Sequence, residues 1–260
     1  MTSTHEWDAA SYERVSDPQF AWGLRVLDRL RLEGGETVID AGCGSGRLTR
    51  VLAGRLPRGH VIAVDRSSNM LEEARARLAD LGDRVSFVAS DLTTFVARAP
   101  VDAVFSTATF HWLHDHERLF TSIRDSLRSG GRLVAQCGGA GNLDRFHAHA
   151  ERVSRSEPFA KWFVDFEPAW NFQRPERTAE RLQRAGFVDV ACNLADAPTP
   201  FADEASFREF VRTVVLRAHL AQLPDEALRA RYLDEVVASV TKAGPLALDY
   251  VRLNIDARRA

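Results

Sequence analysis

The sequence predicts an α/β protein in which helices are wound onto both faces of a mostly parallel, seven-stranded sheet. Short β-branched segments alternate with segments of helical spacing from the first strand onward. A glycine-rich turn joins the first strand to the first helix of this alternation, as in open α/β sheets that bind a ligand at the carboxyl ends of their strands. Two later stretches, one rich in aromatic residues and one of helical spacing, interrupt the pattern and are predicted to be insertions.

The elements follow in a regular order. A helix is predicted over 19–32, where apolar residues recur at helical spacing until Gly34 and Gly35 end it. Another helix starts at Pro175 and ends at Gly186. The predicted strands are 37–40, 61–64, 85–89, 101–106, 132–137, 187–192 and 246–255.

We expect one domain spanning residues 1–260. Its expected parts are an N-terminal arm and helix (1–35), a ligand-binding core (36–138), two insertions (142–172 and 203–243) and a last strand (244–260). The first insertion is rich in aromatic residues, which either cover the ligand edge of the sheet or serve packing alone.

The composition excludes several classes of protein. The 260 residues carry a formal charge of −2, which does not favour electrostatic binding to nucleic acid. The three cysteines (Cys43, Cys137 and Cys192) are scattered, as is usual in a reducing compartment. Neither an apolar signal core nor a run long enough to span a membrane occurs. We expect a cytoplasmic protein without a nucleic-acid or membrane partner, and its oligomeric state stays open.

The glycine turn is the most specific signal. Asp40 ends the first strand, and Gly42, Gly44 and Gly46 follow at G-x-G-x-G spacing, one position tighter than the dinucleotide pattern G-x-G-x-x-G. A carboxylate before the first glycine favours a cationic ligand over a pyrophosphate. This segment resembles motif I of the class I S-adenosylmethionine (SAM)-dependent methyltransferases, and the resemblance implies that SAM is the cofactor.

The same resemblance assigns further cofactor contacts. Asp65 ends the second strand, where an acid accepts the ribose hydroxyls, and Arg66 and Met70 would border the adenine, although Met70 could equally belong to the core. After the third strand, Asp91 would face the adenine amino group and Leu92 would offer its backbone N–H. Asp91 could also be a simple turn former.

Two other regions are implied in cofactor binding. Thr107 follows the fourth strand and would offer backbone groups to the cofactor. In the N-terminal region, Trp7, Tyr12 and Trp22 either pack the helix onto the sheet or belong to an arm that folds over the cofactor. In the second case, Tyr12 and Gln19 would face the methionyl end.

A narrower resemblance covers the whole chain. The chain is similar to the trans-aconitate and malonyl-acyl-carrier-protein methyltransferases in three segments: Trp7-Asp8, Trp112 to His116 and Phe210 to Arg217. That group usually has Gln before the tryptophan, whereas this chain has His111. Histidine can act as a base and glutamine can only form hydrogen bonds, so this position bears on the acceptor.

The histidines after the fourth strand do not predict a metal site. His111, His114, Asp115 and His116 superficially resemble an H-x-H-x-D-H zinc run, but the first gap is one residue too long and no second ligand cluster follows. We expect His114 and His116 to lie on a solvated helix start, and we expect no bound metal.

The sequence therefore predicts methyl transfer from SAM to a small organic acceptor, with carboxylate O-methylation as the preferred hypothesis. Arg217 would clamp the acceptor carboxylate, or else form a surface ion pair. His111 would become the base if the acceptor were a hydroxyl or an amine. An acceptor carried on an acyl carrier and a SAM-binding protein without methyl transfer both stay open. The glycine spacing disfavours a nicotinamide-dependent dehydrogenase.

Overall fold

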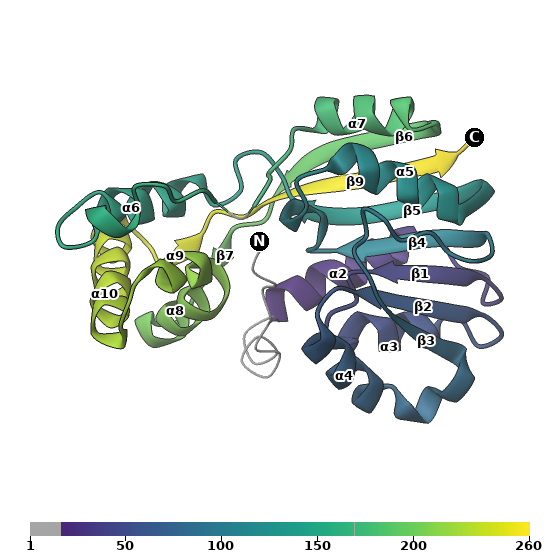
Figure 1. The fold of residues 1–260 in the computed structure, drawn as a ribbon, viewed down its shortest axis with the longest axis horizontal. Coiled ribbons are helices and arrows are strands. Elements are labelled where there is room, and N and C mark those ends of the chain that lie inside the picture. The colour runs from purple at the N-terminus through teal and green to yellow at the C-terminus, as the bar shows by residue number, and fades with distance from the viewer. Residues whose placement is uncertain (1–16, 169) are drawn as a thin grey trace. The chain divides into compact units, whose positions relative to one another are not determined.

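Seven strands form one sheet in the order β3-β2-β1-β4-β5-β9-β6 (Figure 1). Each neighbouring pair from β3 to β5 is parallel, and β9 is antiparallel to β5. This arrangement confirms the predicted mostly parallel, doubly wound α/β sheet. The strands of this sheet are β1 (Thr37–Ala41), β2 (His60–Asp65), β3 (Val85–Ala89), β4 (Val101–Thr107), β5 (Leu127–Gly138), β6 (Phe187–Asp196) and β9 (Val251–Arg259).

The computed structural model describes residues 17–168 and 170–260. The chain divides into two compact units. Unit 1 contains the described residues up to Ala140, Asn171–Ala195 and Arg252–Ala260, and unit 2 contains the described residues of Gly141–Trp170 and Asp196–Val251.

Helices cover both faces of the sheet in unit 1. Along β4, Phe105 packs with residues of α2 (Asp17–Arg29), α3 (Arg47–Gly54) and α4 (Ser68–Arg77). The next residue back, Val104, belongs to the second core, which includes residues of α5 (His116–Ser126) and α7 (Pro175–Arg184). Successive strand residues therefore contribute to opposite cores, as the two-residue period of a strand requires. A short 3₁₀ segment, η1 (Ala79–Arg84), leads from α4 to β3.

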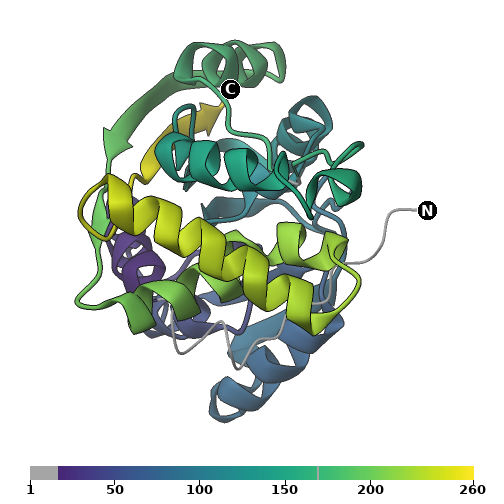
Figure 2. The same cartoon turned by 90° about the vertical axis from the view of Figure 1, so that its left-hand side faces the viewer.

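Unit 2 consists mainly of helices. The long helix α10 (Glu226–Ala243) packs against α6 (Asp144–Ser154), as Figure 2 shows. Strands β7 (Thr199–Pro200) and β8 (Ala247–Leu248) form a separate antiparallel pair. The remaining elements are η3 (Ala160–Trp162), α8 (Glu204–Phe210), the π-helical turn η4 (Val211–Val215) and α9 (Arg217–Gln222).

The predicted last strand, 246–255, is wrong as one element. It is split into β8 and β9, which belong to different sheets. Asp249 stands at the break, and its side chain accepts hydrogen bonds from the backbone N–H groups of Arg145 (2.8 Å) and Phe146 (3.4 Å) in the first turn of α6. A carboxylate satisfies the free N–H groups of a helix N-terminus in this way, and this contact takes the segment out of a continuous strand.

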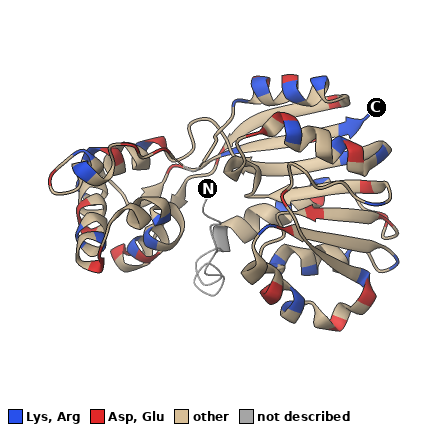
Figure 3. Ribbon diagram, in the orientation of Figure 1, with Lys and Arg blue, Asp and Glu red and all other residues tan. Residues whose placement is uncertain are grey.

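Charged residues of both signs are interspersed along the helices of each unit (Figure 3). Among the described residues, no helix is long and apolar enough to cross a membrane.

Candidate active site

The glycine turn adopts a backbone that only glycine accommodates readily. Gly42, Gly44 and Gly46 have φ of +80°, +54° and +81°. A Cβ on Gly42 would lie 2.1 Å from Oγ1 of Thr109, so the loop after β4 presses directly on this glycine. At Gly44, by contrast, a Cβ would meet nothing within 4 Å. The turn is thus packed at Gly42 and open at Gly44, just before α3.

Asp40 is a buried acid, only 2% exposed, at the carboxyl end of β1. The hydroxyl of Thr49, on α3, donates to its Oδ2 at 2.6 Å. Burial raises the pKa of Asp40 to about 7, against the lowering effect of that hydrogen bond, and the nearby charge of Asp65 raises it further. The carboxyl is poised to change charge near neutral pH.

Asp65 fixes the open part of the glycine turn. Its Oδ2 accepts from the N–H of Gly44 and its Oδ1 from the N–H of Ser67, both at 2.9 Å. Burial raises the pKa of Asp65, and these backbone hydrogen bonds act in the opposite direction. Each carboxylate oxygen can accept a second donor, so both oxygens retain acceptor capacity for a ligand.

The residues predicted around the adenine differ in their surroundings. Arg66 is exposed, Met70 is buried within the core and Leu92 is 8% exposed. Asp91 is exposed, and its Oδ1 accepts both the N–H and the hydroxyl of Thr93. Asp91 therefore forms a side-chain turn, and Ser90 beside it donates its N–H to the carbonyl of Asp65 at 3.1 Å.

The loop after β4 is tied to the glycine turn. The carbonyl of Thr107 accepts the hydroxyl of Thr109 at 2.9 Å, and this hydroxyl also lies 3.4 Å from the carbonyl of Gly42. Ala108 between them has φ of +53°, a strained value for a residue with a side chain, and its N–H donates to the carbonyl of Gln136 at 2.8 Å. The start of the loop is therefore held on two sides.

His111 follows in this loop, in the 3₁₀ turn η2 (Phe110–Trp112), and is 8% exposed. The N–H of Gly138, at the end of β5, donates to His111 Nδ1 at 3.3 Å. Since an N–H only donates, Nδ1 must be the accepting nitrogen, and a neutral ring then carries its proton on Nε2.

The protonation state of His111 follows from its surroundings. Burial, together with the positive charge of Arg252 and the neighbouring His116, holds the pKa of His111 well below 6.5. Its ring lies 4.8 Å from that of Trp112 and 5.8 Å from that of Phe172, measured between centroids. His111 is thus a neutral imidazole, at pH 7, with a proton on Nε2.

Two predicted residues stand apart from this group, and one falls outside the described chain. Gln19 lies on α2, and no described residue donates a hydrogen bond to its buried Oε1 atom. Arg217 is half-buried at the start of α9 and belongs to unit 2, whereas the other described site residues belong to unit 1. Tyr12, like Trp7 and Asp8, lies outside the described residues.

The expectation of a solvated histidine pair is wrong for His116. This residue is 2% exposed, and its Nε2 lies 3.0 Å from the carbonyl of Phe110. Asp115 caps α5 by accepting the N–H of Arg118, which turns the first helical residue inward, while His114 is exposed. Among the described residues, no three His, Cys, Asp or Glu side chains are grouped to hold a metal ion.

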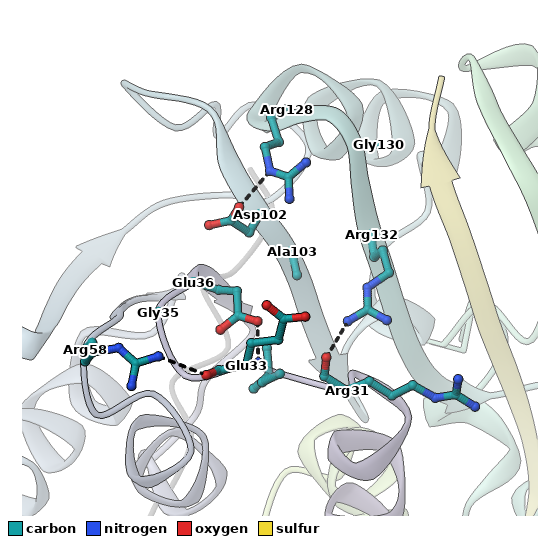
Figure 4. Close-up of a pocket in the computed structure, with 11 residues that line it drawn as sticks. Arg31, Glu33, Gly35, Glu36, Arg58, Asp102, Ala103, Arg128, Gly130 and Arg132 are labelled. Carbon is teal, nitrogen blue, oxygen red and sulfur yellow. Dashed lines mark hydrogen bonds and ion pairs between the residues drawn. The ribbon is translucent and has the colours of Figure 1, made fainter.

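A hollow of about 470 Å³ lies near the amino ends of the central strands, away from the glycine turn that follows the carboxyl end of β1 (Figure 4). Its lining includes Glu36 before β1, Asp102 in β4 and Arg132 in β5, near the amino ends of these strands. Arg128 pairs with Asp102 at 2.7 Å, and Arg58 donates to the carbonyl of Glu33 at 3.2 Å. None of the predicted site residues lines this hollow.

Known proteins resemble this chain in sequence and in fold. Residues 38–131 match a protein family described as a methyltransferase domain. The chain is 31% identical over 257 residues to a trans-aconitate 2-methyltransferase of Methylobacterium radiotolerans, with 95% of this chain and 94% of that protein covered.

Two solved structures share the fold. One is phosphoethanolamine N-methyltransferase 2 of Haemonchus contortus in complex with S-adenosyl-L-methionine, with a TM-score of 0.62, 20% identity and coverage of 96% of this chain and 56% of that chain. The other is the [4+2]-cyclase SpnF, with a TM-score of 0.60, 20% identity and coverage of 92% and 80%. At these identities the likeness shows the fold alone.

The sheet, the glycine turn and these relatives define an enzyme of the class I SAM-dependent methyltransferases, with SAM as its cofactor. Within that class, the chain belongs to the family of the trans-aconitate 2-methyltransferases.

Several residues that shape the site were missed from sequence. Thr49 and Thr109 each donate a hydroxyl to the glycine turn or its acid. Gly138 reaches His111 because β5 pairs with β4, and Arg252 acts on His111 because β9 pairs with β5 and places Arg252 opposite Gly138. Thr49 had a local signal, since it lies in the helix that follows Asp40. For Arg252, 141 residues after His111, no local pattern exists.

Proposed function

We propose that this enzyme transfers the methyl group of SAM to a carboxylate oxygen of a small organic acid. The observation that carries the proposal is the tautomer of His111. With Nδ1 accepting the N–H of Gly138 and the ring neutral, its proton is on Nε2. A base needs a free lone pair, so this nitrogen is a donor to an anionic acceptor rather than a base for a hydroxyl or an amine.

A carboxylate is a suitable acceptor for such a site. A carboxylic acid is ionised at pH 7 because its ordinary pKa is about 4, and it therefore needs no base to become a nucleophile. The relatives named trans-aconitate 2-methyltransferase support this acceptor class. Nε2–H of His111 would orient one carboxylate oxygen, and Arg217 would clamp an acceptor carboxylate through its bidentate guanidinium.

The residues of unit 1 fit the cofactor. The open space at Gly44 leaves room for a ligand against the backbone, and Asp65 retains acceptor capacity for two ribose hydroxyls. No described residue donates to the buried Oε1 of Gln19, which would accept a hydrogen bond from an ammonium group. When bound, SAM supplies a methyl group activated by a positively charged sulfur. Asp40 would contribute negative charge toward this cation.

The remaining predicted residues have secondary roles in this proposal. Arg66 and Leu92 would border the adenine, with the carboxylate of Asp91 toward its amino group. Thr107 and Tyr12 would line the methionyl side. The main contribution of the protein to the rate would be alignment of the acceptor in a site that excludes water, and orientation of this kind is worth roughly 7–11 kcal/mol.

The test compares two substitutions of His111. Glutamine retains an N–H donor and lacks a basic nitrogen, so His111→Gln is expected to keep kcat/KM for a di- or tricarboxylic acid within about threefold of the native enzyme. His111→Ala removes the donor and is expected to lower kcat/KM by about 10- to 100-fold, the usual cost of losing a hydrogen bond to a charged group. Ester formation is measured with purified protein, SAM and candidate acids.

The same assay distinguishes the alternatives. Loss of all turnover in His111→Gln, together with methylation of hydroxyl or amine acceptors by the native enzyme, would show that His111 is a base. An unchanged KM for the acid in Arg217→Ala would remove Arg217 from the proposal. Binding of SAM without release of S-adenosylhomocysteine from any acceptor would indicate a role other than methyl transfer, which the shared fold of a cyclase makes worth measuring.

A further inference from the structure

Asn171, at the point where the chain re-enters unit 1, holds the part of the loop that carries His111. The N–H of Asn171 donates to the carbonyl of His111 at 2.7 Å. Its side-chain Nδ2 donates to the carbonyls of Leu113 (3.1 Å) and His114 (3.3 Å). Asn171 therefore satisfies three backbone carbonyls within a four-residue stretch, which fixes the course of the loop around His111.

The orientation of the Asn171 amide is set from a distance. Arg181, on α7, has only donors, and its Nη1 donates to Oε1 of Gln173 at 2.7 Å. With its oxygen facing Arg181, Gln173 presents its Nε2 to Asn171 and donates to Oδ1 there. Asn171 must then direct its Nδ2 toward the loop. The charge of Arg181 thus sets the direction of the side-chain hydrogen bonds from Gln173 to Asn171 and from Asn171 to the loop. We call these three residues (Arg181, Gln173 and Asn171) the Arg181 relay.

Arg181 and Gln173 are each anchored in unit 1 by a further contact. Arg181 is 9% exposed, and its Nε lies 3.4 Å from Oε1 of Glu117 in the first turn of α5. The carbonyl of Gln173 accepts the N–H of Ala140 at 3.0 Å, just after the end of β5. Because these two residues are fixed, the relay holds the loop in one position and does not follow its movement.

We propose that Asn171 is a positioning residue, oriented by Arg181 through Gln173, which holds His111 so that its Nε2–H faces the acceptor. This inference rests on the proposed function of His111. It adds that the direction of the Arg181 relay, and not only its presence, is required for acceptor recognition. Among the described residues, no hydrogen bond joins Asn171, Gln173 or Arg181 to the glycine turn, so the proposed cofactor contacts there are separate from the relay.

Gln173→Glu tests the direction separately from the stability of the fold. Glutamate keeps an acceptor, now charged, for Arg181, so the protein is expected to unfold at the same temperature as the native enzyme or higher. It has no side-chain N–H for Asn171, so either the amide turns its oxygen toward the loop carbonyls or its oxygen faces the carboxylate, and both arrangements weaken the hold on the loop. We expect kcat/KM for the acid to fall about 10-fold, with unchanged affinity for S-adenosylhomocysteine by calorimetry. Gln183→Glu, an exposed glutamine on the same helix, is the matched control and should leave both values unchanged.

A second measurement does not require an acceptor. In protein labelled with ¹⁵N-histidine, the two imidazole nitrogens of His111 report its tautomer. The native protein should show a single Nε2–H form, and Gln173→Glu should show averaging of both tautomers as the loop loosens.

The two measurements separate the two proposals. An unchanged kcat/KM and an unchanged His111 spectrum in Gln173→Glu would overturn the positioning role of Asn171, whatever the acceptor is. If the native enzyme esterifies no carboxylic acid, the proposed function fails, and the His111 spectrum still decides whether the relay holds the loop.

Discussion

The side chain of Asp40 is buried, so water does not solvate its carboxylate charge. The glycine turn that follows Asp40 is predicted to face a cationic cofactor. Burial raises the pKa of this carboxyl to about 7 from an ordinary 3.8. Because the folded state holds this proton more tightly than the unfolded chain, Asp40 lowers the free energy of unfolding progressively as the pH rises from about 4 to 7. A bound cation would reverse the preference and favour the carboxylate.

Binding of SAM near pH 6 is therefore expected to release up to one proton from Asp40. The released protons are counted by titration calorimetry in two buffers that differ in ionisation enthalpy. Asp40→Asn is the control. Because its amide cannot release a proton, it should bind SAM with the same observed heat in both buffers. Equal proton release by the native protein and Asp40→Asn would assign the proton to another group and remove Asp40 from the charge balance of the site.

Single residues also show where prediction from sequence ends. The glycine turn and its acid are local, so spacing alone identified Gly42, Gly44 and Gly46, whose positive φ values the structure confirms. The chemistry of His111 is not local. Its tautomer depends on the N–H of Gly138, 27 residues away. A sequence shows that a histidine is present, but the partner that decides between donor and base is set by the tertiary fold.

Among the secondary-structure elements, those with clear ends were predicted closely. Helix α7 begins at Pro175 and ends just before Gly186, whose φ is +95°, as proline and glycine at these positions predict. Strand β3 also matches its predicted range. The split of the last strand could not be predicted, because Asp249 leaves it to bind the N-terminus of α6 more than 100 residues earlier.

Two elements of unit 2 bring together the half-buried His147 and the buried His219. His147 on α6 and His219 on α9 lie with their rings nearly parallel and 6.4 Å apart, and Trp170 stacks on His147 at 4.3 Å. Burial lowers the pKa of His147 to about 4 and that of His219 to about 3. Both rings are therefore neutral in the folded enzyme at pH 7.

We expect acid to destabilise the folded protein through this pair. Below pH 6.5 the unfolded histidines bind protons and the folded ones do not, so the free energy of unfolding falls by about 1.4 kcal/mol per pH unit for each histidine until the folded pKa is reached. His219→Phe should remove one of these contributions between pH 6 and 4, as measured by urea unfolding. His114→Phe, at an exposed position, is the control and should keep the native slope. Identical slopes in the native protein and His219→Phe would show that the cluster opens before it is protonated.

At the scale of the whole molecule, unit 2 is formed by two insertions into the chain of unit 1, so the chain passes between the units four times. The first insertion leaves after Ala140 and returns at Asn171, and these two places are joined by the bridge between Gly139 and Gln173. The second leaves β6 after Ala195 and returns in β9 at Arg252, and β6 and β9 are neighbours in the sheet. Each insertion thus starts and ends at adjacent points of unit 1.

A module whose ends meet can be exchanged without disturbing the scaffold that receives it. Recombination among related genes could replace either insertion by a longer, shorter or unrelated one, and the neighbouring strand ends would still be joined. The sheet and its glycine turn would then keep the same methyl donor through evolution, while new insertions changed the repertoire of molecules that receive the methyl group.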